Sequence, residues 1–204
     1  MKWAAVILAG GSGTRLGGEL KALIELEGER LVERAARLLV GADTVLVSCG
    51  PHDPRSWNLA ADWLTLPDLP LPLAGPLAGL LAAIDWAERQ PLPPDVIVLA
   101  PVDSPLLPHD LPARLIAGLA NAPASLAGHA GELYPTSSAW RLDAIASLPR
   151  EASAGTAPRS LRRLAERLQA RIVEVPTGPD GGNPLADLDT PADRPALARR
   201  LRRH

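Results

Sequence analysis

The chain has 204 residues, of which 47% are hydrophobic and 22% are charged. This is enough to bury about two-thirds or more of the unfolded surface, so we expect residues 1–204 to form a single domain and exclude a disordered or collagen-like chain. Acidic and basic side chains nearly balance, at 23 against 21, for a formal net charge of −2. Without a general positive field, neither nucleic acid nor an anionic membrane is expected as a partner.

Cysteine content and hydropathy indicate the compartment. The single cysteine, Cys49, excludes an internal disulfide and any zinc site with more than one cysteine ligand. The first apolar run ends at Ala9, which is too short for the hydrophobic region of a secretory signal. No stretch reaches the ~18 uncharged apolar residues that a membrane span needs. We therefore expect a cytoplasmic protein.

Apolar runs alternate along the chain with segments of helical spacing. The runs at residues 3–9 and 96–100 are unbroken, which is typical of strands covered on both faces of a parallel sheet. In chain order, we predict a strand at Trp3–Ala9, a helix at Leu31–Val40, a strand at Thr44–Ser48, a helix at Pro76–Glu88, a strand at Val96–Ala100, helices at Leu111–Ala120 and Ser160–Leu168, a strand at Arg171–Val175 and a helix at Pro191–Arg203.

This alternation predicts an α/β fold with a doubly wound, mostly parallel sheet of the Rossmann type. The segment Ala124–Trp140 has the turn Gly128-His129-Ala130-Gly131 in its middle. Two short strands around that turn would form a small antiparallel excursion from the main sheet.

A glycine-rich segment directly follows the first predicted strand and reads Leu8-Ala9-Gly10-Gly11-Ser12-Gly13-Thr14-Arg15-Leu16-Gly17-Gly18-Glu19-Leu20-Lys21. Its glycines leave successive backbone N–H groups uncovered by side chains, an arrangement that can bind phosphate. It is not a Walker A loop, because Lys21 follows Leu20 rather than glycine and Ala22 offers no hydroxyl for a metal. It also lacks the third glycine of the dinucleotide fingerprint, since Leu16 stands there. A flexible glycine turn is the alternative.

Two cations of this segment, Arg15 and Lys21, are candidates for phosphate contacts. An ammonium suits a point contact with a phosphate oxygen, whereas a guanidinium can make a forked contact. Lysine is also unusual in this chain, because only Lys2 and Lys21 among the 21 basic residues are lysines. The alternative for each cation is a solvated surface charge.

The segment from Leu8 to Lys21 resembles the signature loop of nucleotidyltransferases with a glycosyltransferase-A-like Rossmann fold. These enzymes move a nucleoside monophosphate from a nucleoside triphosphate onto a phosphorylated acceptor. The double glycine after Ala9, the pair Gly17-Gly18 and the sequence Gly75-Pro76-Leu77-Ala78-Gly79 are most similar to the molybdenum cofactor guanylyltransferase family. Further blocks follow in the family's order: Ala100–Pro105, Tyr134–Thr136, Arg159–Arg162 and Asp189–Asp193.

Candidate metal ligands come from two later blocks. Asp103 follows the predicted strand at 96–100, at the carboxyl end where open α/β sheets place ligands. Mg²⁺ on a triphosphate takes one or two carboxylates together with phosphate oxygens and water. The resemblance makes Asp103 the metal ligand, while a turn or helix cap is the alternative. Asp187 and Asp189 would face the same way on an extended segment, so they can complete the metal site or contact the acceptor. Asp189 can also cap the last helix.

The resemblance also implies a nucleotide pocket. A carboxylate such as Asp68 can accept two hydrogens from the Watson–Crick edge of guanine or bind ribose hydroxyls. Without the resemblance, Asp68 would be interpreted as a turn residue. The implied nucleotide-binding residues are Leu8, Ala9, Gly10, Gly11, Ser12, Gly13, Thr14, Arg15, Lys21, Asp68, Gly75 and Asp103.

Four residues, at three places in the chain, differ from the family pattern. Leu20 stands where aspartate is common, Tyr134 stands where histidine is usual, and Asp187 with Asp189 replace two asparagines. We assign Tyr134, Asp187 and Asp189 to acceptor binding, and the differences leave the identity of the acceptor open.

The resemblance implies transfer of GMP from GTP to the terminal phosphate of molybdopterin, with Mg²⁺ as cofactor and release of pyrophosphate. Arg15, Lys21 and Asp103 would be the catalytic residues. Another triphosphate such as CTP, another phosphorylated acceptor, or nucleotide binding without turnover are the alternatives. Proteins that deliver the cofactor or take up the product are expected as transient partners.

Overall fold

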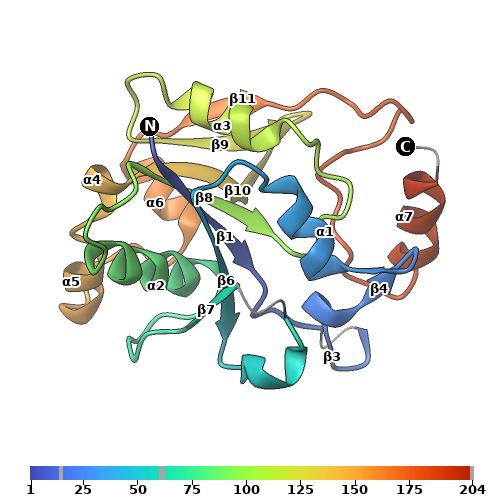
Figure 1. Ribbon diagram of the computed structural model, residues 1–204. Coiled ribbons are helices and arrows are strands. Elements are labelled where there is room, and N and C mark those ends of the chain that lie inside the picture. The colour runs from blue at the N-terminus through green and yellow to red at the C-terminus, as the bar shows by residue number, and fades with distance from the viewer. Residues whose placement is uncertain (14–15, 60–62, 203–204) are drawn as a thin grey trace.

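The computed structural model describes residues 1–13, 16–59 and 63–202. A seven-stranded sheet crosses its centre in the order β11-β9-β10-β8-β1-β6-β7 (Figure 1). Its strands are β1 (Trp3–Leu8), β6 (Thr44–Gly50), β7 (Leu64–Pro67), β8 (Val96–Pro101), β9 (Ala124–His129), β10 (Glu132–Arg141) and β11 (Arg171–Glu174). Neighbours pair in parallel except β10, which is antiparallel to both β8 and β9. The predicted mostly parallel α/β fold is confirmed.

The predicted strand–turn–strand at residues 124–140 is present as β9 and β10. It lies within the main sheet, because β10 inserts between β8 and β9 and pairs with both. Small antiparallel pairs form elsewhere, by β2 (Ser12–Gly13) with β3 (Glu19–Leu20) and by β4 (Glu25–Leu26) with β5 (Glu29–Arg30).

Helices cover both faces of the sheet (Figure 1). They are α1 (Leu31–Leu38), α2 (Pro76–Glu88), α3 (Leu111–Leu119), α4 (Leu142–Ile145), α5 (Leu148–Ser153), α6 (Leu161–Arg167) and α7 (Asp193–Leu201). Successive side chains of β1 point to opposite faces, as strand geometry requires. Ala5 and Ile7 join the core beneath α1 and α7, whereas Ala4 and Val6 join the core beneath α2 and α6. Burial on both faces explains the unbroken apolar run of β1.

The strand order reverses beside β1. From β1 the sheet extends through β6 to β7, and the chain then returns to place β8 on the other side of β1. Open α/β sheets bind ligands at such a reversal, in the crevice outside the carboxyl ends of the strands. The segments that follow β1 and β8 are the glycine-rich segment and the Asp103 segment, so both begin at this reversal.

The strand β7 was not predicted from the sequence. This strand is at the edge of the sheet, and its residues are exposed or only half-buried, so its sequence lacks the continuous apolar run of a central strand. The predicted helices at 31–40 and 191–203 are shorter at their ends in the structure, at Leu31–Leu38 and Asp193–Leu201.

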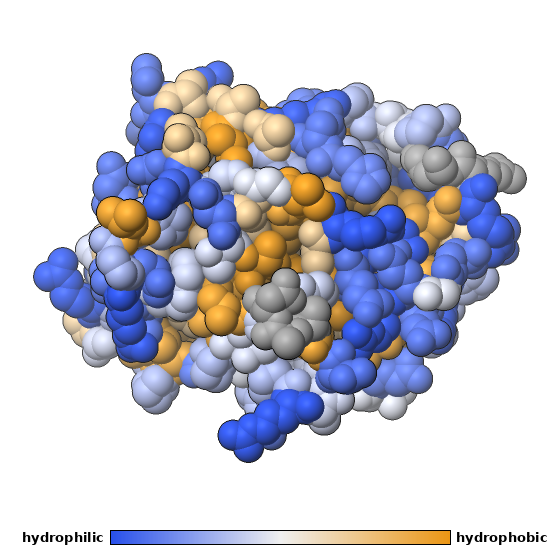
Figure 2. All heavy atoms as spheres, viewed as in Figure 1, coloured by the Kyte–Doolittle hydropathy of each residue, from blue (hydrophilic) through white to orange (hydrophobic). Residues whose placement is uncertain are grey.

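Hydrophobic side chains form a band across the middle of one face, and hydrophilic side chains cover the side on which α7 lies (Figure 2). Throughout the described part of the chain, the helices lack the length and apolar character that a membrane crossing requires.

We expect Cys49 to be unreactive in the folded protein. Its side chain is fully buried in β6, and burial raises the pKa of the thiol to about 11, so the nucleophilic thiolate is scarce. At about pH 8, Ellman's reagent should label the denatured chain completely and the folded chain only slowly. Rapid stoichiometric labelling of the folded protein would contradict this burial.

Candidate active site

Where the glycine-rich segment leaves the sheet after β1, its backbone passes very close to the end of β6. A Cβ atom on Gly10 would lie 2.6 Å from the Cα atom of Gly50, the last residue of β6. Gly50 itself has a φ of +60°, a conformation that glycine adopts at little cost. The N–H of Ala9 still donates to the carbonyl of Ser48, at 2.9 Å. The two glycines therefore let the backbone turn into the crevice while β1 and β6 remain in register.

The same segment then folds back on itself. The β2–β3 ribbon pairs Ser12 with Leu20 and Gly13 with Glu19. Lys21 follows as the first residue of a short 3₁₀ helix, η2 (Lys21–Leu23). The predicted residues Thr14 and Arg15 lie outside the described residues, so the role of Arg15 stays a prediction.

Lys21 joins the two predicted carboxylates. Its Nζ donates to Oδ2 of Asp103 and to Oδ1 of Asp189, at 2.6 Å in each case. The Lys21 side chain is only 12% exposed, whereas that of Asp189 is 52% exposed, so the cation is sheltered and one carboxylate reaches solvent. Desolvation lowers the pKa of Lys21, but the hydrogen bonds and the charges of Asp103 and Asp189 together outweigh it, so the pKa is raised overall. Lys21 is therefore charged at neutral pH.

The segment at 187–189 confirms the alternation expected from sequence. The N–H of Leu188 donates to the backbone carbonyl of Asp103, at 2.8 Å, and the Leu188 side chain is fully buried in the core. Asp187 and Asp189 are both exposed on the other side of this segment. The interpretation of Asp189 as a helix cap is wrong. Instead, the carboxylate of Asp193 accepts the backbone N–H groups of Asp189 and Thr190.

Asp187 has a different partner from Asp189. The hydroxyl of Ser104 donates to its Oδ1. Although Asp187 reaches solvent, its pKa is raised to about 6, chiefly by desolvation and then by the neighbouring carboxylate of Asp103. The hydrogen bond from Ser104 opposes this shift. Ser104 was not a predicted site residue, although it directly follows Asp103.

Tyr134 is held near the same carboxylates. Its hydroxyl donates to Oε2 of Glu132, at 2.9 Å, and accepts from Nδ2 of Asn183, at 2.8 Å. Desolvation raises the pKa of Tyr134, and the negative charge of Asp187 adds to the shift. The structure thus brings the three predicted acceptor residues into one region. Asn183 was not predicted, because its Gly-Gly-Asn-Pro context indicates only a turn.

The two predicted nucleoside residues follow β7. Asp68 begins the connection after this strand, and its N–H donates to the carbonyl of Gly50, at 3.4 Å. Burial raises the pKa of its carboxyl group. Gly75 precedes α2 with φ +72° and ψ −155°, a region essentially restricted to glycine. Pro76 then starts the helix at a position where its missing N–H costs nothing.

Gly79, the last residue of the Gly75–Gly79 block, lies where α2 packs on the sheet. A Cβ atom there would lie 2.6 Å from Oγ of Ser48 and 2.9 Å from Cδ2 of Leu8. A larger side chain there would have to displace Ser48 and Leu8, so glycine lets α2 pack closely on β1 and β6. The block therefore fixes where α2 begins and how closely the helix packs on the sheet.

The carboxylates around Lys21 suit a divalent cation. Asp103 and Asp189 each direct an oxygen at one position, the Lys21 ammonium. Within residues 1–13, 16–59 and 63–202, no three His, Cys, Asp or Glu side chains gather as a metal-binding group. Mg²⁺ is usually held by one or two carboxylates and takes its other oxygens from phosphates and water. The residues present fit a cation that binds together with a nucleotide.

Fold and site together place the protein among the nucleotidyltransferases. Residues 5–175 match the family described as the MobA-like NTP transferase domain. The chain is 37% identical over 207 residues to the molybdenum cofactor guanylyltransferase of Rhodobacter capsulatus, covering 100% of this chain and 99% of the relative. The chain therefore belongs to the molybdenum cofactor guanylyltransferase family.

Solved structures share the fold. The molybdopterin-guanine dinucleotide biosynthesis protein A of Archaeoglobus fulgidus superposes with a TM-score of 0.73 at 20% identity, covering 99% of this chain and 100% of that one. A Mycobacterium tuberculosis H37Rv protein solved as a complex with manganese superposes with a TM-score of 0.67 at 18% identity, covering 98% and 99% of the two chains.

We expect neighbouring glycines to respond differently to alanine. Gly10→Ala forces two backbones apart and should lower the free energy of unfolding by about 1–3 kcal/mol, the usual range for overpacking. Gly11→Ala is the matched control, because a Cβ there meets nothing within 4 Å, and its effect should stay within about 0.5 kcal/mol. Urea denaturation measures both variants. Equal stabilities would show that the Gly10–Gly50 contact does not constrain the loop.

Proposed function

We propose that the protein transfers GMP from GTP to the terminal phosphate of molybdopterin and releases pyrophosphate. The observation that carries this proposal is the convergence of Asp103 and Asp189 on Lys21 at the reversal of strand order. With a divalent cation on the two carboxylates, such a site would neutralise the phosphates of two anionic substrates. The relative from R. capsulatus, which aligns over this whole chain, is named as a guanylyltransferase and supports the choice of GTP and molybdopterin.

The nucleotide would bind at the glycine-rich segment and at the start of α2. Backbone N–H groups of residues 8–13 would contact the triphosphate, with Arg15 and Lys21 supplying positive charge. Asp68 would accept hydrogens from the guanine edge or the ribose hydroxyls. Gly75 would line the nucleoside, because its lack of a side chain leaves the start of α2 open.

Asp103, with Asp189, would hold Mg²⁺. The bound ion would offset negative charge on the phosphates. The manganese complex of the M. tuberculosis protein supports a divalent cation in a related fold. When phosphate oxygens enter, Lys21 can exchange a carboxylate contact for a phosphate contact and stabilise the leaving pyrophosphate.

The acceptor would lie beside Tyr134, Asp187 and Asp189. An oxygen of its terminal phosphate forms a bond to the α-phosphorus of GTP, while the bond from that phosphorus to the β-phosphate oxygen breaks and pyrophosphate leaves. A phosphate is already ionised at neutral pH, so no general base is needed. The residues then act mainly by positioning and charge neutralisation. We further propose that the reaction occurs in the cytoplasm, with transient contacts to proteins that deliver or receive the cofactor.

The proposed reaction can be tested with purified protein, Mg²⁺, molybdopterin and each of the four ribonucleoside triphosphates. We expect pyrophosphate release and dinucleotide formation with GTP only. Product formation with CTP instead would favour cytidylyl transfer. GTP binding without product would indicate another phosphorylated acceptor, and no nucleotide binding at all would contradict the proposal.

Asp103→Asn should lower kcat by about 10²–10³-fold, the usual cost of losing a key electrostatic contact in the transition state. Asp110→Asn is the matched control, because Asp110 is an exposed carboxylate seven residues along the same connection and pairs with Arg114. Steady-state rates over a range of Mg²⁺ concentrations measure the effect. Unchanged Mg²⁺-dependent turnover in Asp103→Asn would remove this residue from the site.

Lys21→Ala should weaken GTP binding and lower kcat, since the sheltered cation is lost. Lys2→Ala provides the control, because Lys2 is the other lysine of the chain and is exposed near the N-terminus. Nucleotide titration followed by turnover assays separates the two effects. Normal binding and turnover in Lys21→Ala would refute its assignment.

A further inference from the structure

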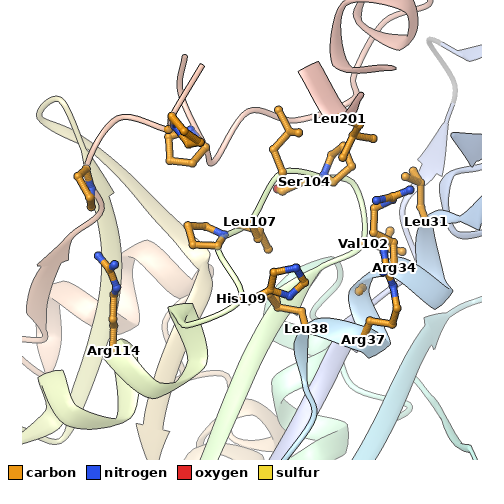
Figure 3. A pocket seen from close by; sticks show the side chains of 18 of the residues that line it. Leu31, Arg34, Arg37, Leu38, Val102, Ser104, Leu107, His109, Arg114 and Leu201 are labelled. Carbon is orange, nitrogen blue, oxygen red and sulfur yellow. The ribbon is translucent and has the colours of Figure 1, made fainter. Parts of the chain in front are cut away.

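A cavity of about 510 Å³ lies behind the loop that carries Asp103, on the face of the sheet covered by α1 and α3. Its walls come from α1, from residues 102–109 and from residues 176–184 (Figure 3). This volume is typical of sites for small molecules. The described residues of the glycine-rich segment, 8–13 and 16–21, contribute nothing to the lining, so the cavity is separate from this part of the proposed nucleotide site.

Much of the wall is rigid and apolar. Leu38 of α1 and Leu107 face the cavity, which is closed on other sides by several prolines (Figure 3). These prolines are Pro105, Pro108, Pro176, Pro179 and Pro184. Proline restricts the backbone, so a ligand would lose little free energy in ordering this wall. An apolar ring is the kind of group that such a wall accepts.

Positive charge gathers around this apolar wall. Figure 3 shows Arg34 and Arg37 of α1 on one side, Arg114 of α3 on the other, and His109 between them. Among the described residues that line the cavity there is no Asp or Glu. Arg114 pairs with Asp110, so the positive charge that is not fully offset lies at Arg34 and Arg37.

The two arginines of α1, Arg34 and Arg37, carry two positive charges but share one carboxylate. Arg34 and Arg37 share the single carboxylate of Glu29, at 2.9 Å and 2.7 Å. An anionic group bound beside the two guanidinium groups would offset this surplus charge.

We propose that this cavity binds a small molecule that joins an apolar ring to an anionic group such as a carboxylate, phosphate or sulfonate. The ring packs against Leu38, Leu107 and the prolines, and the anion binds Arg34 and Arg37. This site is independent of the proposed guanylyl transfer, because it uses none of the residues assigned to GTP, Mg²⁺ or the acceptor.

The cavity also shares structure with the active site. Ser104 lines it and donates its hydroxyl to Asp187. Residues 102–109 include Asp103, and residues 176–184 lead directly to Asp187. A ligand in the cavity therefore contacts both segments that position the carboxylates, as an effector of the enzyme would.

The probe for this site is 1-anilinonaphthalene-8-sulfonate, an aromatic sulfonate whose fluorescence rises in apolar surroundings. We expect one equivalent to bind to the full chain and to remain bound at saturating GTP and Mg²⁺. Arg34→Met and Arg37→Met should each weaken binding by about tenfold, the effect of losing one charge-assisted hydrogen bond. Leu107→Trp should weaken binding, because the indole would occupy the part of the apolar wall on which the ring of the ligand packs. The uncharged analogue N-phenyl-1-naphthylamine should bind at least about tenfold more weakly.

Arg89→Met is the matched control, because Arg89 follows α2 on the opposite face of the sheet and pairs with Asp85. It should bind the probe like the unaltered protein. Arg37 is more exposed than Arg34, at 56% against 16%, so Arg37→Met tests the charge even if Arg34→Met does not fold. Displacement by GTP, equal binding of the uncharged analogue, or unchanged binding in Arg37→Met and Leu107→Trp would each overturn the proposal.

Discussion

The ammonium of Lys21 holds together three parts of the chain that are far apart in sequence. Its carboxylate partners, Asp103 and Asp189, lie 82 and 168 residues away. Asp103 follows β8 at the reversal of strand order. The segment that carries Asp189 is hydrogen-bonded to the Asp103 backbone through the N–H of Leu188. Because one cation satisfies both carboxylates, the glycine-rich segment, the Asp103 loop and the C-terminal segment share a single arrangement. The proposed chemistry depends on that arrangement.

Backbone packing keeps this arrangement in place. The Gly10–Gly50 contact lets the chain leave the sheet, and Gly79 lets α2 pack closely on β1 and β6. On the C-terminal side, the buried side chain of Leu188 and its N–H bond to Asp103 fix the direction in which Asp187 and Asp189 face. Small residues and one buried leucine thus position the charged side chains, which themselves remain partly in contact with solvent.

The central strands were the elements that the sequence predicted best, because their burial leaves a clear hydrophobic pattern. Central strands such as β1 and β8 appear as unbroken apolar runs because both faces are covered, whereas the half-exposed edge strand β7 left no such pattern. Asp103 and Lys21 could be named as candidates from motifs and strand ends. Their direct contact could not be predicted, because it depends on how distant segments pack.

The remaining differences also have physical causes. Ser104 and Asn183 were missed because their partners, Asp187 and Tyr134, lie 83 and 49 residues away. Asp189 was wrongly assigned as a cap because α7 begins later than the sequence indicated. Its N-cap residue is Ala192, and Asp189 lies three residues upstream, where its side chain contacts Lys21. Asp193, the first residue of the helix, accepts the backbone N–H groups of Asp189 and Thr190.

The most direct measurement is a crystal structure of the protein with GTP and Mn²⁺, in which anomalous scattering locates the metal. We expect one Mn²⁺ bound to Asp103 and to phosphate oxygens, with the triphosphate along residues 8–13 and Lys21 in contact with it. A metal or triphosphate bound away from Asp103 and Lys21 would refute the proposed site.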